Sequence, residues 1–226
     1  MEKLHNSDRV SPLKQEIVRI PSDGHILHGV LSYSGSNVLP GVVLLHPHPL
    51  YGGDMNNYVV TTLEGVFQEG GFSTLRFDFR GASSNPHGYS GVRGAVSDAV
   101  SAVEFLKAQT GVSEIGIVGY SFGASTALRL ALKKTPTFLV TLSASRDLVA
   151  EDGFDIQQLT NLRCPVLMFH GDSDQMIPVD DLTGLAEVIG FDIARTVSLE
   201  GEGHFYERKL ADVATSVREF VSELYP

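Results

Sequence analysis

The chain has 226 residues, of which 42% are hydrophobic and 19% charged, and its formal net charge is −10. This is the composition of an ordinary globular protein, and the acidic balance argues against a nucleic-acid partner, because binding to phosphates requires a basic surface. The length suits one domain, over residues 1–226, with a sizeable core.

Three features of the chain bear on its location. Its single cysteine, Cys164, cannot form an internal disulfide, which fits a reducing cytoplasm. Residues 1–10 contain no apolar stretch of the kind found in signal peptides. No apolar run approaches the roughly 18 residues that a membrane-spanning helix needs. We therefore expect a cytoplasmic protein without a membrane span, whose oligomeric state does not follow from the sequence.

Hydrophobic periodicity and turn residues predict alternating strands and helices. The first two strands flank a turn at 21–24 and are expected to form a hairpin. In chain order the predicted strands are 14–20, 25–34, 41–47, 72–80, 114–121, 137–144, 164–171 and 194–201. The predicted helices, in which apolar residues recur at helical spacing, are 59–67, 96–106, 124–132, 182–189 and 210–224.

This alternation of strands and helices predicts an α/β fold. Right-handed crossovers give a mostly parallel sheet, here of eight strands, with helices on both faces. In such sheets, ligands bind at the carboxyl ends of the strands. Polar residues gather at five of those ends, in the stretches 44–53, 77–81, 121, 170–178 and 200–206. We expect these stretches to meet in space.

Ser121 is the strongest candidate for a nucleophile. It is the centre of a G-x-S-x-G sequence, 119–123, between a predicted strand and a predicted helix. Such a turn forces the serine into an unfavourable backbone conformation and crowds its neighbours, which therefore have to be small. The same Gly-Tyr-Ser tripeptide at 88–90 follows no strand and has Val92 in place of the second glycine. Ser90 is therefore interpreted as an ordinary loop residue.

A serine hydroxyl becomes a good nucleophile only when a base accepts its proton. His204 is the best candidate for this base, because it lies in the loop 201–205 after the last strand. The base in turn needs a carboxylate to orient it, which Asp172 or Asp174 could supply. Both follow the strand 164–171, so position alone does not choose between them.

An oxyanion hole requires backbone N–H groups directed at the developing negative charge. One donor is expected to be Phe122, directly after the nucleophile. The other is expected in the loop after the third strand, where Pro47 and Pro49 have no N–H group. His48 and Leu50 remain, and we favour His48 because it lies two residues beyond the histidine that ends the strand.

His46 and His48 could also place two imidazoles on one side of a strand, as in a metal site. No third ligand follows at a useful spacing, so we expect no metal, and the chemistry above requires no organic cofactor. His46 and His170 are instead expected to bond to loop carbonyl groups beneath the site.

Together these motifs resemble the α/β-hydrolase superfamily, in which the chain order is Ser…Asp…His. The resemblance runs from about residue 13 to the end of the chain. "GYSFGA" resembles the nucleophile elbow, "RFDFRG" the D-x-R-G segment and "GEGHF" the G-x-x-H-F loop. "HGDSDQMIP" resembles H-G-x-x-D-x-x-V-P, with Ile177 in place of valine, which implies that Asp174 is the acid.

The most distinctive segment, "HPHPLYGGDMNN", resembles a group of small microbial serine hydrolases related to dienelactone hydrolases. The latter use a cysteine nucleophile where this chain has Ser121, so a dienelactone is not the expected substrate. The D-x-R-G match implies a structural role for Arg80 rather than contact with an acidic acyl group. The interval 145–163, where lids are inserted, has room for about one short helix and a loop. We therefore expect an open, shallow site without a lid domain.

The resemblance implies a carboxylesterase-like serine hydrolase that uses Ser121, His204 and Asp174 on a small-molecule ester through an acyl-enzyme intermediate. An open site favours short or exposed acyl groups. The same residues could act on a thioester, a lipid-derived ester or, as an aminopeptidase does, a peptide near its N-terminus. A non-catalytic binding protein on this fold is the remaining alternative.

Overall fold

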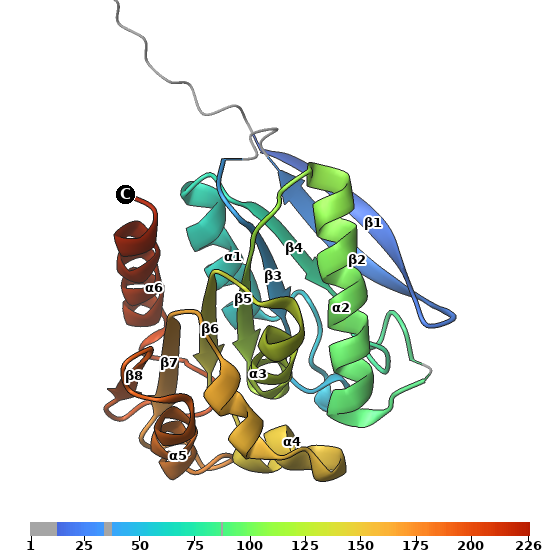
Figure 1. The fold of residues 1–226 in the computed structure, drawn as a ribbon. Helices are drawn as coiled ribbons and strands as arrows, with labels where there is room; N and C mark the ends of the chain where they lie inside the picture. Colours follow the sequence, from blue (N-terminus) through green and yellow to red (C-terminus); the bar gives the residue numbers. More distant parts are fainter. Residues whose placement is uncertain (1–12, 34–37, 87) are drawn as a thin grey trace, which may run out of the picture.

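Eight strands form one continuous sheet in the computed structural model, which describes residues 13–33, 38–86 and 88–226 (Figure 1). They are β1 Lys14–Ser22, β2 His25–Tyr33, β3 Gly41–Leu45, β4 Ser73–Phe77, β5 Ile115–Tyr120, β6 Phe138–Leu142, β7 Val166–Gly171 and β8 Ala194–Leu199. Their order across the sheet is β1-β2-β4-β3-β5-β6-β7-β8, and the strands from β4 to β8 are parallel. Only β2 is antiparallel to both neighbours, so the predicted mostly parallel, eight-stranded sheet is confirmed.

The predicted N-terminal hairpin is the pair β1 and β2, which extends the sheet at one edge (Figure 1). Its turn consists of Asp23 and Gly24, with φ of 42° and 79°. Glycine adopts this left-handed conformation without steric cost. The turn is therefore tighter than the four residues predicted, and the strands continue to its edge.

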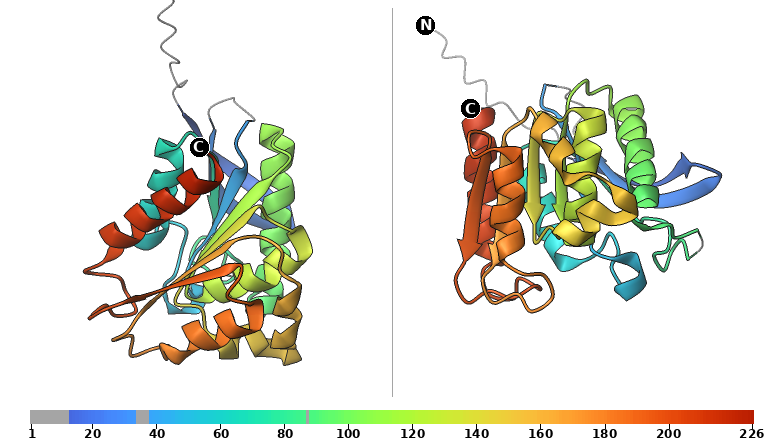
Figure 2. Two further views of the ribbon diagram at one scale, coloured as in Figure 1. Left: turned by 60° about the vertical axis from the view of Figure 1, so that its left-hand side comes forward. Right: turned by 60° about the horizontal axis from the view of Figure 1, so that its bottom comes forward.

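Helices cover both faces of the sheet, as predicted. Their bounds are α1 Tyr58–Glu69, α2 Gly91–Thr110, α3 Phe122–Lys134, α4 Arg146–Ala150, α5 Asp180–Ile189 and α6 Leu210–Leu224. Figure 2 shows α1 and α6 on one side of the sheet and α2 and α3 on the other. Successive strand residues point to opposite faces. Val43 therefore joins the apolar core under α2, α3 and α5, whereas Val42 joins the core under α1 and α6.

Helix α2 is longer than the apolar pattern predicts, because it begins five residues before the predicted start at 96. The Glu151 carboxylate accepts a hydrogen bond from the Val92 N–H group at 2.5 Å. It thus satisfies one of the free N–H groups of the first turn and places a negative charge at the positive end of the helix dipole. A cap that comes from 59 residues along the chain leaves no local signal in the sequence.

The interval between β6 and β7, which this structure describes completely, holds no lid domain. It contains α4 and two 3₁₀ turns, Glu151–Gly153 and Ile156–Asn161, rather than one helix and a loop. Val149 and Leu159 are buried in the same core as α2, α3 and α5. The segment therefore packs on the same face of the sheet as α2, α3 and α5.

Two expectations from the sequence concern a membrane span and a signal peptide. No helix in the described part of the chain combines the length and apolar character needed to cross a bilayer. The expectation that residues 1–10 carry no signal peptide concerns a segment outside the described residues.

Candidate active site

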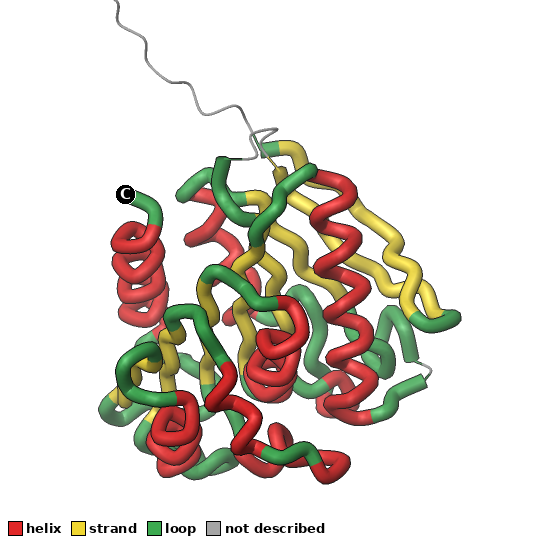
Figure 3. Tube along the Cα trace, in the orientation of Figure 1, coloured by secondary structure: helices red, strands yellow, loops and turns green. Residues whose placement is uncertain are grey.

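The loops at the carboxyl ends of the parallel strands, whose direction Figure 1 shows, gather at one end of the sheet, the lower end in Figure 3. Three predicted residues meet there. Ser121 Oγ lies 3.0 Å from His204 Nε2, and His204 Nδ1 lies 2.7 Å from Asp174 Oδ2. Because an ionised carboxylate only accepts hydrogen bonds, His204 Nδ1 carries the proton and Nε2 accepts from the serine hydroxyl. The three side chains, which follow β5, β8 and β7, form one directed chain of hydrogen bonds.

Ser121 sits on a strained turn between β5 and α3. Its φ of 57° and ψ of −117° are values that L-residues other than glycine rarely adopt. Its neighbours are as crowded as predicted. A Cβ atom at Gly119 would lie 2.3 Å from the Gly123 carbonyl oxygen, and one at Gly123 would lie 2.2 Å from that of Leu45. Only glycine fits either position, so the two flanking glycines hold the serine on this turn.

The loop that carries His204 is fixed by two buried groups. The Tyr120 hydroxyl donates to the His204 carbonyl oxygen at 2.8 Å, which ties the loop to the end of β5. The Glu202 carboxylate accepts hydrogen bonds from the N–H groups of Gly203, Arg208 and Lys209. These contacts fix the backbone on both sides of the His204 side chain. Sequence reasoning missed both Tyr120 and Glu202, although each lies within the quoted motifs.

Of the two candidate acids, the structure places Asp174 and not Asp172 against His204. Asp174 Oδ1 accepts from the N–H groups of Met176 and Ile177, at 2.8 and 3.0 Å. Asp172 Oδ1 instead accepts from the Ser173 hydroxyl and the Gly201 N–H group. Asp172 therefore stabilises the loop that contains Gly201.

The charge on Asp174 is stabilised strongly. Its side chain is fully buried, and burial alone would raise the pKa of its carboxyl group. The hydrogen bonds from His170, His204, Ile177 and Met176 outweigh burial and hold that pKa well below its usual value. The group therefore remains a carboxylate around neutral pH.

The N–H groups of Phe122 and His48, the two donors favoured from the sequence, are both free to donate. Phe122 opens α3, and neither N–H group has a hydrogen-bond acceptor among the described residues. Leu50, the other donor that the sequence left open, donates its N–H group to His48 Nδ1 at 3.2 Å. Gly53 folds back to donate to the His48 carbonyl oxygen at 3.0 Å. This arrangement favours His48 over Leu50 as the second donor.

The other two histidines considered from the sequence, His46 and His170, make hydrogen bonds to the backbone. His46 Nδ1 donates to the Pro47 carbonyl oxygen at 2.6 Å, and its Nε2 accepts from the Phe79 N–H group at 2.9 Å. His170 Nε2 donates to the Ile177 carbonyl oxygen at 3.1 Å. Both histidines thus bond to loop carbonyl groups, as expected. No cluster of three or more metal-ligating side chains occurs within residues 13–33, 38–86 and 88–226.

Arg80 is held in a buried ion pair with Asp98, at 2.6 Å, and does not line the site cavity. Asp78, the acid of the same D-x-R-G segment, accepts the Met55 N–H group at 2.7 Å and the Ser84 hydroxyl. This segment thus positions the loop after β3. The structural role expected for Arg80 agrees with these contacts.

Tyr89 is a site residue that the sequence did not indicate. Its hydroxyl group accepts from His48 Nε2 at 3.0 Å, since Nδ1 of that ring already accepts from Leu50. Burial, followed by the nearby charge of Glu151, raises the pKa of Tyr89 to about 12. Burial also lowers the pKa of His48. Both rings are therefore neutral around pH 7.

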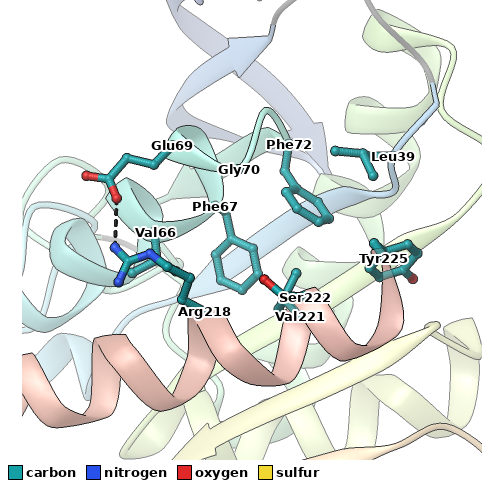
Figure 4. Close-up of a pocket in the computed structure, with 10 residues that line it drawn as sticks. All are labelled: Leu39, Val66, Phe67, Glu69, Gly70, Phe72, Arg218, Val221, Ser222 and Tyr225. Atoms are coloured by element: carbon teal, nitrogen blue, oxygen red, sulfur yellow. Dashed lines mark hydrogen bonds and ion pairs between the residues drawn. The ribbon is translucent and has the colours of Figure 1, made fainter.

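A cavity of about 120 Å³ opens beside Ser121 and His204. It is lined by Pro47, His48, Tyr51, Gly52, Gly53, Asn57, Tyr120, Ser121, Met176, His204 and Phe205. A larger cavity of about 250 Å³ lies between α1 and α6, with the Glu69–Arg218 ion pair at its rim (Figure 4). None of the residues that line it belongs to the site around Ser121, so the smaller cavity is the one relevant to chemistry there.

Residues 85–211, more than half of the chain, match the sequence model of the dienelactone hydrolase family. A protein of unknown function from Agrobacterium tumefaciens is 27% identical, with a TM-score of 0.83 over 92% of this chain and 95% of that one. An α/β serine hydrolase homologue from Coxiella burnetii is also 27% identical, with a TM-score of 0.79 over 90% and 96%. An α/β serine hydrolase without a lid from Xanthomonas campestris is 22% identical and shares the fold, with a TM-score of 0.80 over 97% and 99%.

Proposed function

The chain belongs to the dienelactone hydrolase family, and from this premise we propose that it is a serine hydrolase that cleaves carboxylic esters. Membership of the α/β-hydrolase superfamily, predicted from the motifs, is confirmed. The proposal goes further, because it assigns the nucleophile to Ser121, the base to His204 and the acid to Asp174. The observation that carries it is the directed hydrogen-bond chain from the serine hydroxyl to the carboxylate.

The proposed reaction begins when Ser121 Oγ attacks the ester carbonyl carbon and His204 Nε2 accepts the hydroxyl proton. The carbonyl oxygen becomes an oxyanion, which the N–H groups of Phe122 and His48 stabilise. Each such donor contributes on the order of 100-fold or more to the rate. The carbon–oxygen bond to the alcohol then breaks, and His204 returns the proton to the leaving oxygen. Throughout, Asp174 stabilises the imidazolium.

Deacylation repeats these steps with water as the nucleophile. His204 Nε2 removes a proton from water, the hydroxide attacks the acyl carbon, and the proton passes to Ser121 Oγ as the carboxylic acid leaves. The small cavity beside Ser121 supports a short group on one side of the ester. The lack of a lid in the interval 145–163 supports a longer group that stays exposed.

A fluorophosphonate probe tests the proposal, because it reacts with activated serines. We expect the wild-type chain and Ser90→Ala to be labelled, and Ser121→Ala to remain unlabelled while folded. Ser90 is a matched control, since it lies in the same Gly-Tyr-Ser tripeptide without a strand before it. A folded wild-type chain that is never labelled would support the binding-protein alternative.

The class of bond is tested separately with acetyl esters, acetyl thioesters and aminoacyl amides of matched size. We expect kcat/KM to be highest for the oxygen esters. A preference for thioesters or amides would retain the nucleophile and change the substrate class.

A further inference from the structure

Three exposed apolar side chains surround the mouth of the cavity beside Ser121. They are Tyr51, Met176 and Phe205, which are 82%, 59% and 56% exposed, and all three line the cavity. We call them the apolar rim. Single exposed apolar residues are common on protein surfaces, but a group that converges on one opening marks a binding surface.

The apolar rim is assembled from three strand ends and is held close to the proposed reacting groups. Tyr51 follows β3, donates its N–H group to the His48 carbonyl oxygen at 3.1 Å, and has its ring 4.6 Å from the His48 ring. Met176 follows β7 and donates its N–H group to Asp174 Oδ1 at 2.8 Å. The backbone of two rim residues is therefore tied directly to the proposed reacting groups.

Phe205 completes the rim on the side of β8. It follows His204 directly in the chain, and its ring lies 5.6 Å from the His204 ring in an edge-on arrangement. Phe191 offers a comparison, because it is similarly exposed, at 61%, but lies before β8, at the opposite end of that strand. Exposure alone therefore does not define the apolar rim. Its three side chains are set apart because they line the same cavity.

The cavity lining carries no lysine, arginine, aspartate or glutamate side chain among the described residues. A charged substrate group would lose water there without gaining an ion-pair partner, which is unfavourable. Arg80 is paired with Asp98 and does not line this cavity. The lining of this cavity therefore favours an uncharged group.

The size of the cavity divides the substrate into two parts. At about 120 Å³ it is well below the 300–1,000 Å³ that encloses a drug-sized ligand. It admits only a small group next to Ser121. A larger group has to lie outside, over the apolar rim, where burying its surface against aromatic and thioether side chains stabilises binding.

We propose that the apolar rim binds the larger group of an uncharged ester, an aryl or alkyl group, while the small other half of the ester occupies the cavity. This inference rests on the proposed esterase function and specifies its substrate class. The occupant is a single dissolved ester molecule, since the rim is only three side chains across.

The test compares kcat/KM for four esters: methyl acetate, benzyl acetate, methyl 3-phenylpropionate and monomethyl succinate, followed by acid release. Benzyl acetate carries the apolar group on the alcohol, and methyl 3-phenylpropionate carries it on the acid. Monomethyl succinate carries a charge. We expect at least one aryl ester to exceed methyl acetate by about tenfold, as burial of part of an aromatic ring predicts. Monomethyl succinate should be the poorest substrate.

The variants Tyr51→Ser, Met176→Ser and Phe205→Ser are then compared with Phe191→Ser, the matched control. In the rim variants we expect the ratio of kcat/KM for the aryl ester to that for methyl acetate to fall about 3- to 10-fold each, mainly through KM. Phe191→Ser should leave this ratio at the wild-type value. A melting temperature for each variant confirms that the chain is folded.

The possible outcomes separate this inference from the proposed function. If every ester is inert and Ser121 is not labelled by the fluorophosphonate, the proposed function fails. If methyl acetate is hydrolysed but the rim substitutions leave the ratio unchanged, only the inference on the rim fails. Hydrolysis that appears only with emulsified or micellar ester would mean that the rim meets an aggregate, which would overturn the single-molecule occupant.

Discussion

His170 Nε2 lies 3.4 Å from Asp174 Oδ2, the same carboxylate oxygen that His204 Nδ1 contacts at 2.7 Å. The His170 side chain is fully buried, and its Nδ1 atom has no hydrogen-bond partner among the described residues. Its Nε2 proton is shared between the Ile177 carbonyl oxygen and the carboxylate. The proposed acid is thus held between two imidazoles, only one of which faces the serine.

His170→Phe removes one donor from Asp174 while it keeps a flat ring in the buried site. We expect kcat to fall by about 2- to 10-fold, as loss of one hydrogen bond predicts. The carboxylate then stabilises the imidazolium of His204 more strongly, so the acidic limb of the pH–rate profile moves to higher pH. Profiles of kcat/KM from pH 4 to 9 check this. A slower variant with an unshifted profile would limit His170 to a purely structural role.

Asp174→Asn and Asp172→Asn form a matched pair of substitutions two residues apart. We expect Asp174→Asn to reduce kcat by about 10⁴-fold, because an amide no longer selects the correct tautomer of His204. Asp172→Asn keeps an oxygen that can accept from Gly201 and is expected to retain most activity. Steady-state kinetics with 4-nitrophenyl acetate measure both. Equal losses would reverse the assignment of the acid.

Tyr120→Phe deletes only the hydroxyl group that holds the His204 carbonyl oxygen. We expect a loss of about 1 kcal/mol in the free energy of unfolding, together with a lower kcat, because the base becomes less well positioned. Tyr206→Phe is the control, since it removes a buried hydroxyl that contacts Ser143 and the Phe169 carbonyl oxygen rather than the His204 carbonyl oxygen. Similar kcat values in the two variants would argue against a positioning role for Tyr120.

The depressed pKa of Asp174 predicts how stability depends on pH. Its pKa is lower in the folded state than in the unfolded state, so its contribution is complete above the unfolded value of about 4. That contribution is lost as pH falls below this value towards the folded one. Urea unfolding of wild type and Asp174→Asn at pH 7, 5, 4 and 3 measures the difference. We expect the wild-type advantage to be constant down to about pH 5 and to shrink below it; an advantage that grows with acidity would contradict this.

Asp98→Asn tests the buried ion pair with Arg80. The Asp98 side chain is fully buried, and the substitution leaves the guanidinium with only the exposed carboxylate of Asp23, at 3.7 Å, as a charged partner. We expect the free energy of unfolding to fall by about 3–5 kcal/mol. Glu223→Gln removes an exposed partner of Arg195 and is expected to cost less than about 1 kcal/mol. Urea denaturation distinguishes the two, and equal costs would show that burial does not matter here.

The site residues whose role could be predicted from the sequence are those whose role depends on local contacts. The glycines around Ser121 are required by contacts within a few residues and across one strand, so the pattern itself indicated the nucleophile. The choice between Asp172 and Asp174 could not be made from position, because both follow the same strand. It came from resemblance, and the direction of the two side chains now supports it.

The residues that could not be predicted act across long sequence separations. Glu151 caps α2 from 59 residues away, and Tyr89 reaches His48 across 41 residues. Neither contact changes the hydrophobic period or a turn signal, which are what a single sequence displays. Helix starts, loop supports, the order of strands across the sheet and the lining of the cavity therefore depended on the tertiary structure, whereas the alternation of strands and helices followed from the pattern.

The missing lid has a kinetic consequence. With only α4 and two short turns between β6 and β7, no lid domain in this described interval has to open before an ester arrives or an alcohol departs. Solvent can reach the acylated serine as soon as the first product diffuses away. Turnover in the proposed reaction is therefore paced by bond making and breaking at the serine, and added viscogens such as sucrose should leave kcat essentially unchanged.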